Sequence, residues 1–259
     1  MTSKTIVFVH GMFVTPLCWE GWVNYFQAHG YPCVAPAWPG RDQPVSTLKN
    51  NHPDPQLGRL TLAEVIAHHV RIIQGLDEKP ILIGHSMGGL ITQILLQRDL
   101  AAAGVAIDSG PPLGVLTTKL SFFKVNWPVI NPFVSATEPY YMPFEAFQYA
   151  FVNTLSLEEQ RAAYDNYAVP ESRQVGRGAL SNLAKVDFKQ ARAPLLLIAG
   201  SADNIIPPSL NRTNYEKYKA SPSVTDFKEF AGRTHFIIGQ KNWEEVADYV
   251  RSWLSRQGL

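Results

Sequence analysis

The pentapeptide Gly84-His85-Ser86-Met87-Gly88 constrains the fold of this chain more than any other stretch. It joins the apolar run 80–83, which predicts a buried strand, to a helical pattern over 87–98. A turn this sharp strains the serine and presses the residues two before and two after it against neighbouring backbone. Glycine fits these two positions because it has no Cβ. The turn is expected to raise Ser86 Oγ above a sheet edge, at a helix N-terminus that favours negative charge.

Composition excludes several classes of function. The 259 residues can form one large α/β core with an inserted segment. The net charge is +1 and like charges do not cluster, which argues against nucleic-acid and membrane-surface partners. No apolar stretch approaches the roughly 20 residues of a membrane span. The first residues, 1–4, pass directly into a strand with no room for a signal peptide, and Cys18 and Cys33 are expected to be buried thiols. We therefore expect a cytoplasmic protein.

Strand and helix patterns alternate along most of the chain. Alternation of this kind predicts parallel pairing with right-handed crossovers, and therefore a doubly wound sheet between two layers of helices. Thr61 and Glu64 form a capping-box pair that begins one of the helices, and Ser156 and Glu159 form another. The expected strands are 5–9, 31–38, 80–83, 104–108, 193–200 and 224–230, and the last of them has the alternating pattern of a sheet edge.

The regular alternation stops between the fourth and fifth expected strands. We expect residues 1–112 and 191–259 to form the core domain and residues 113–190 to form an inserted helical cap, because bare loops of this length are uncommon. The cap is rich in aromatic residues, most of which are expected to form its own small core. A minority should line an apolar pocket. The predicted substrate contacts are Phe13, Trp127, Phe144 and Phe147.

The first strand ends in His10-Gly11-Met12-Phe13. In a chain with a strained serine turn, a backbone N–H just after such a glycine commonly supplies half of an oxyanion hole. We assign this donor to Met12, with Phe13 as the second choice, and the other donor to Met87, which follows the serine. The alternative is that His10-Gly11 is only a tight turn.

A serine hydroxyl needs a base to take its proton, and the base needs an acid that orients it. The order Ser86, Asp203, His235 supplies all three, each just after an expected strand. No other histidine lies C-terminal to His85. This arrangement resembles the α/β-hydrolase superfamily along essentially the whole chain. The resemblance places the acid after the strand that follows the cap, as at Asp203, but some members carry it after the earlier strand, where Asp108 lies. Asp108 could instead cap local N–H groups.

The chain departs from the larger superfamily pattern because it has no N-terminal hairpin before the first parallel strand. The departure predicts a wholly parallel sheet of six strands, similar to small bacterial esterases and plant-type methylesterases. Ser86 argues against dehalogenases and epoxide hydrolases of this fold, which have Asp at that position. Gly11 argues against hydroxynitrile lyases, which usually have Thr there.

The resemblance implies a serine esterase that cleaves a carboxylic ester of a hydrophobic small molecule through an acyl-enzyme. It implies no metal and no organic cofactor. The same residues are compatible with lactone opening, carbon–carbon bond hydrolysis or perhydrolysis, because specificity depends on the cap. Two further alternatives are a ligand receptor with slow turnover and a structural protein without activity. Monomer and dimer are both compatible with the sequence.

Overall fold

The computed structural model describes residues 4–259, so residues 1–3 of the expected N-terminal passage lie outside it. Its six strands form one sheet in the order β2-β1-β3-β4-β5-β6, and every neighbouring pair is parallel. The prediction of a wholly parallel six-stranded sheet is confirmed. The strands are β1 Ile6–Val9, β2 Cys33–Val34, β3 Ile81–His85, β4 Ala103–Ile107, β5 Leu195–Gly200 and β6 Thr225–Phe230.

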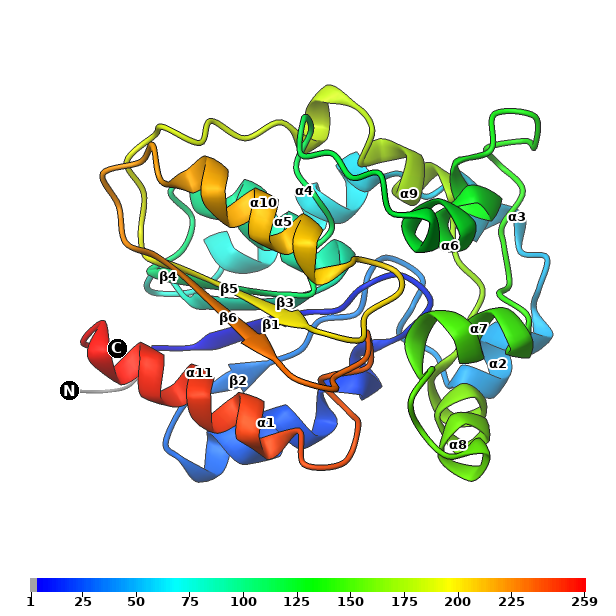
Figure 1. Ribbon diagram of the computed structural model, residues 1–259, viewed down its shortest axis with the longest axis horizontal. Helices are drawn as coiled ribbons and strands as arrows, with labels where there is room; N and C mark the ends of the chain where they lie inside the picture. Colours follow the sequence, from blue (N-terminus) through cyan, green and yellow to red (C-terminus); the bar gives the residue numbers. More distant parts are fainter. Residues whose placement is uncertain (1–3) are drawn as a thin grey trace.

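Helices cover both faces of this sheet (Figure 1), with α1 and α11 on one face and α4, α5 and α10 on the other. The four inner strands are buried along their whole length, as their uninterrupted apolar composition requires. β6 lies at an edge and is mostly half-buried, as its alternating pattern predicts. The covering helices are α1 Glu20–Ala28, α4 Leu62–Gln74, α5 Met87–Gln97, α10 Pro208–Tyr218 and α11 Glu244–Arg256.

The two predicted capping boxes are present. In the first, Thr61 Oγ1 accepts a hydrogen bond from the Glu64 N–H at 3.3 Å, and Glu64 Oε2 accepts one from the Thr61 N–H at 2.8 Å. The reciprocal pair between Ser156 and Glu159 begins helix α8, Leu157–Tyr167. Each box satisfies two N–H groups that the helix itself leaves without partners.

The region after β1 differs from expectation in two ways. The expected strand over 31–38 shrinks to the two residues of β2, because prolines at 32 and 36 have no N–H to donate to a neighbouring strand. The segment between β2 and α4, rich in proline and asparagine, was expected from the sequence to be a loop up to about residue 60, but it contains the short helices α2 Val45–Asn50 and α3 Pro55–Arg59. The 3₁₀ turn η1 Pro16–Trp19 precedes α1. Cys18 is buried as expected, whereas Cys33 on the edge strand is only half-buried, and both thiols are free.

The segment between β4 and β5 is helical, as expected. It contains α6 Leu120–Ile130, α7 Phe144–Phe151, α8, α9 Arg173–Gly178 and the 3₁₀ turn η2 Asn182–Ala184. In Figure 1 these helices gather beyond the arrowheads of the strands, next to α2 and α3. Within residues 4–259, no helix is long and apolar enough to cross a membrane. The division into core and cap domains stays a prediction, since α9 packs against α3 and α4 of the core as well as against α6.

Candidate active site

Ser86 lies on the predicted turn between β3 and α5. Its backbone has φ of 56° and ψ of −120°, a conformation that L-residues rarely adopt. A Cβ added to Gly84 would lie 2.1 Å from the carbonyl oxygen of Gly88, and one added to Gly88 would lie 2.0 Å from that of Val9. The two glycines of the motif are therefore required by close backbone contacts on both sides of the serine.

Asp203 and His235 follow β5 and β6 and form a hydrogen-bonded pair. The Nδ1–H of His235 donates to Asp203 Oδ2 over 2.6 Å, and both side chains are completely buried. The other carboxylate oxygen of Asp203 accepts the N–H groups of Ile205 at 2.7 Å and Ile206 at 2.9 Å. Burial raises the pKa of Asp203, and these two N–H groups oppose that rise because they stabilise the ionised form.

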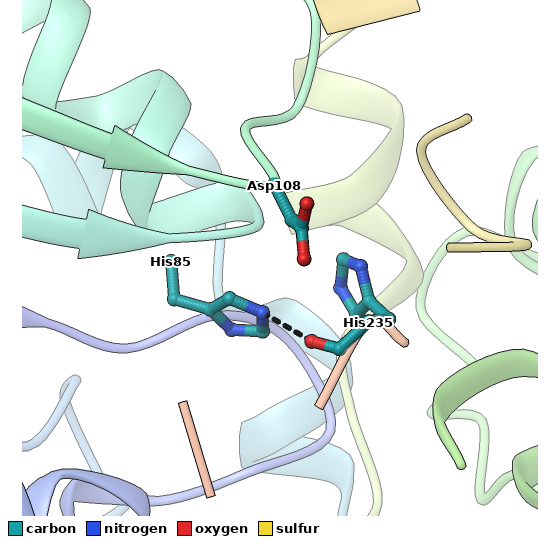
Figure 2. Close-up of side chains that lie close together, drawn as sticks. All are labelled: His85, Asp108 and His235. Atoms are coloured by element: carbon teal, nitrogen blue, oxygen red, sulfur yellow. Dashed lines mark hydrogen bonds between the residues drawn. The ribbon is translucent and has the colours of Figure 1, made fainter. Parts of the chain in front are cut away.

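The loop that carries His235 is attached to the serine turn. His85, the residue before Ser86, donates its Nε2–H to the carbonyl oxygen of His235 over 2.7 Å (Figure 2). The ring of Phe151 contacts the ring of His235 edge-on, with 5.1 Å between centroids. The Nε2 atom of His235 is buried and has no hydrogen-bond partner among residues 4–259. Burial lowers the pKa of His235 to about 3, so its imidazole is neutral and this nitrogen carries a lone pair.

Asp108, the alternative acid, follows β4 and also lies beside His235. Figure 2 shows its carboxylate directed toward the ring of His235. One oxygen accepts the N–H of Gly200 at 2.7 Å, while the other is buried without a partner among the described residues. Burial raises the pKa of Asp108 well above its usual range, and the negative charge of Asp203 raises it further. Asp203 has three N–H donors and Asp108 has one, so the negative charge is better stabilised on Asp203.

The loop after β1 lies directly against the serine. A Cβ on Gly11 would be 2.8 Å from the Cβ of Ser86. His10 holds this loop in place, because its Nδ1–H donates to the Gly11 carbonyl at 2.8 Å and its Nε2 accepts the N–H of Trp38 at 3.2 Å. These contacts define more than a tight turn, since they place the backbone of residues 11–12 beside the serine.

The two choices for the oxyanion donor in this loop differ in their surroundings. The N–H of Phe13 donates to Glu171 Oε2 over 3.4 Å. The N–H of Met12 has no acceptor among the described residues. Met87 is the first residue of α5, where helical N–H groups have no partner within the helix. The geometry therefore favours the N–H of Met12 over that of Phe13 as the second oxyanion donor, together with the N–H of Met87.

Sequence reasoning did not find Glu171 and Arg41. Both side chains are buried, with 3.5 Å between Arg41 Nη2 and Glu171 Oε2, and Arg41 also donates to the Pro170 carbonyl. Through Glu171 this pair connects the segment before α9 to the N–H of Phe13. No local motif marks either residue, because the partners are separated by more than a hundred positions in the chain.

An apolar cavity lies over Ser86. The empty space at this site is about 780 Å³ when the open solvent at its mouth is included, and the cap segment provides much of its wall. Among the described lining residues, only Ser86 and Asn126 have polar side chains. The lining consists of Met12, Phe13, Ser86, Met87, Gly110, Pro111, Phe122, Val125, Asn126, Val129, Ile130, Met142, Phe151, Gly176, Ala179, Leu180, Ile205 and Ile206.

Of the four expected substrate contacts, Phe13 lies in this lining, and Trp127, Phe144 and Phe147 do not. Trp127 is 48% exposed, because the helical period of α6 turns it away from the face that carries Phe122 and Val125. Phe147 is completely buried and stacks on Phe151 with 4.5 Å between ring centroids. Phe144 packs against Tyr164 of α8. Phe144 and Phe147 therefore belong to the small core of the cap.

His85, Asp108 and His235 are also a group of metal-ligating type. One donor atom from each lies within 4.8 Å of the others. His85 Nε2 already donates its hydrogen to the His235 carbonyl, so this nitrogen has no lone pair for an ion. The side chains of His85 and Asp108 form hydrogen bonds with backbone groups, and that of His235 forms one with Asp203.

Comparison with known proteins gives one family and many similar structures. Curated protein sequences give no match. Similar solved structures include a monoacylglycerol lipase from Paleococcus ferrophilus (21% identity, 99% of this chain and 96% of that chain, TM-score 0.68). They also include tomato methylketone synthase I complexed with 2-tridecanone (16% identity, 99% of this chain and 100% of that chain, TM-score 0.70). A third is a pyrethroid hydrolase from Sphingobium faniae JZ-2 (18% identity, 97% of this chain and 97% of that chain, TM-score 0.68). These likenesses show the fold. A family model described as alpha/beta hydrolase matches residues 6–249, and the chain therefore belongs to the alpha/beta hydrolase family.

Proposed function

We propose that the protein is a serine hydrolase that cleaves a carboxylic ester of a hydrophobic small molecule. The observation that carries this proposal is the position of Ser86, on a strained turn in the wall of an apolar cavity. The preceding residue, His85, is hydrogen-bonded to the carbonyl oxygen of His235, which forms a buried pair with Asp203. The names of the similar structures support it, since two of them are a lipase and a pyrethroid hydrolase.

In the first half-reaction, Ser86 Oγ attacks the ester carbonyl while His235 Nε2 takes its proton. The N–H groups of Met12 and Met87 stabilise the negative oxygen that forms, and loss of one such donor costs on the order of 3 kcal/mol in the barrier. Asp203 stabilises the imidazolium, because its carboxylate already accepts the Nδ1–H. His235 then protonates the leaving alcohol, and the acyl group remains on Ser86.

In the second half-reaction, His235 takes a proton from water, which attacks the acyl-enzyme. The same oxyanion donors stabilise the second tetrahedral intermediate, and its collapse returns the proton to Ser86. Asp108 remains protonated in this scheme, since burial and the charge of Asp203 both disfavour its ionisation. No step requires a metal or an organic cofactor.

The direct test is hydrolysis of p-nitrophenyl esters from acetate to decanoate, with and without a serine-directed phosphonate. We expect turnover that the phosphonate abolishes, with a preference for longer acyl chains because the cavity is apolar. Labelling of Ser86 without turnover of any ester would contradict ester hydrolysis. It would favour carbon–carbon bond hydrolysis or slow ligand sensing at the same serine.

The pH dependence follows from the burial of His235. A general base works in its neutral form, and the lowered pKa keeps His235 neutral when the pH falls below the ordinary histidine value of 6.5. We expect kcat/KM, which reports the free enzyme, to remain high through pH 6.5 and to decline only in more acidic solution. The measurement is kcat/KM against pH, followed at the isosbestic wavelength of p-nitrophenol. An acid limb centred at or above 6.5 would contradict a buried neutral base.

Gly11→Ala should slow catalysis more than it destabilises the fold. The added Cβ would meet Ser86 Cβ at 2.8 Å and the His85 carbonyl at 3.0 Å, which displaces the loop that presents Met12. Misplacement of a catalytic group by about 1 Å can cost about 100-fold, so we expect kcat to fall by up to that factor. Gly75→Ala is the matched control, because its Cβ meets nothing closer than 3.4 Å. Equal kcat in the two variants would contradict the role of this loop.

A further inference from the structure

Asn126 provides a polar side chain in a wall that is otherwise apolar apart from Ser86. It lies on the inner face of α6, between lining residues of the same helix, and is half-buried. When a ligand fills the cavity it displaces water from such a group, which is costly unless the ligand satisfies the group itself. The polar atoms of Asn126 that have no hydrogen-bond partner in the described part of the protein are therefore available to a ligand.

The hydrogen bonds of the Asn126 side chain define the orientation of its amide group. Asn126 Nδ2 donates to the carbonyl oxygen of Phe122 at 2.8 Å and to that of Ile205 at 3.3 Å. Carbonyl oxygens only accept, so both partners require the NH₂ end at this position and exclude the flipped amide. Both amide hydrogens are thus used. Oδ1 has no donor within hydrogen-bond distance among residues 4–259.

The same two bonds hold the amide rigidly. Phe122 is one turn earlier on α6, and the N–H of Ile205 donates to Asp203 Oδ1. A fixed acceptor in an apolar cavity selects ligands by their donors, because a ligand without one leaves the acceptor unsatisfied. The cavity thus combines a large apolar wall with a single oriented acceptor.

We infer that Asn126 is a specificity-determining residue, whose Oδ1 accepts a hydrogen bond from a hydroxyl or N–H group of the substrate. The substrate class is then an apolar ester that carries one hydrogen-bond donor away from the scissile bond. This inference rests on the proposed ester hydrolysis at Ser86. A neutral hydrogen bond contributes a factor of about 3 to 10 in kcat/KM.

The test compares p-nitrophenyl octanoate with its monohydroxylated analogues and their methyl ethers, with the substituent at successive carbons that cannot cyclise onto the ester. For at least one position, Asn126→Leu should lower the ratio of kcat/KM for the hydroxy ester to that for the parent by about 3- to 10-fold. The corresponding ratio for the methyl ether, which has no donor, should not change. Phe123→Leu, on the exposed side of α6, is the control and should leave both ratios unchanged.

Asn126→Asp separates substrate recognition from a purely structural role. The carboxylate keeps an acceptor oxygen but cannot donate to the Phe122 and Ile205 carbonyls, so we expect a lower melting temperature with the hydroxyl preference retained. Equal losses on all esters in both variants would overturn the inference and leave only a structural role. Ester turnover with no change in any hydroxy ratio would also overturn it, while the proposed function would stand. Absence of turnover on the whole series would contradict both.

Discussion

Replacement of Ser86 by alanine is expected to lower kcat for ester hydrolysis by on the order of 10⁶-fold. The serine provides the nucleophile of the first half-reaction, and without it no acyl-enzyme forms for water to hydrolyse. The fold should be retained, because alanine has the same backbone restrictions at φ of 56° and the glycines on both sides are unchanged. Thermal unfolding and phosphonate labelling, measured with the rate, test these points.

Ser209→Ala, an exposed serine at the start of α10, is the matched control for this measurement. It should retain full turnover and full labelling by the phosphonate. Turnover by Ser86→Ala at a rate near that of the unchanged protein would exclude the acyl-enzyme mechanism. Labelling that persists in Ser86→Ala would place the reactive serine elsewhere in the chain.

Asp203→Asn and Asp108→Asn should differ strongly when assayed side by side. For Asp203→Asn we expect kcat to fall by about 10⁴-fold, because an amide neither stabilises the imidazolium nor enforces the correct tautomer of His235. For Asp108→Asn we expect a loss of less than about tenfold, since an amide resembles the protonated carboxyl group that burial favours there. The measured quantity is kcat for one ester, with thermal unfolding of both variants as the control.

A larger loss for Asp108→Asn would reassign the acid. Asp108 would then have to be ionised despite its single N–H donor, and Asp203 would have to carry the proton. Comparable losses in both variants would show that the two carboxyl groups share one charge beside His235. Either result would contradict the acid assignment while leaving Ser86 and His235 in place.

The features that the sequence alone determined are those with a local cause. The steric demand for glycine at positions 84 and 88 acts within one turn, and the contacts of 2.1 and 2.0 Å that a Cβ would make confirm it. The wholly parallel sheet follows from the alternation of apolar strands with helices, and the capping boxes follow from side chains three residues apart. The expected strand over 31–38 was wrong in its length, because the prolines at 32 and 36 have no N–H to donate and only residues 33–34 form a strand.

Tertiary structure decided what depends on partners far apart in the chain. The choice between Met12 and Phe13 rests on Glu171, which is 158 positions from Phe13 and takes the Phe13 N–H. The preference for an ionised Asp203 over an ionised Asp108 rests on the number of backbone N–H groups that donate to each carboxylate. This number cannot be obtained from the amino-acid composition. The cavity wall depends on which face of α6 turns inward. Residue type and spacing thus identified the candidate residues of the site, whereas the burial and hydrogen bonds that distinguish among these candidates arise only when distant segments pack together.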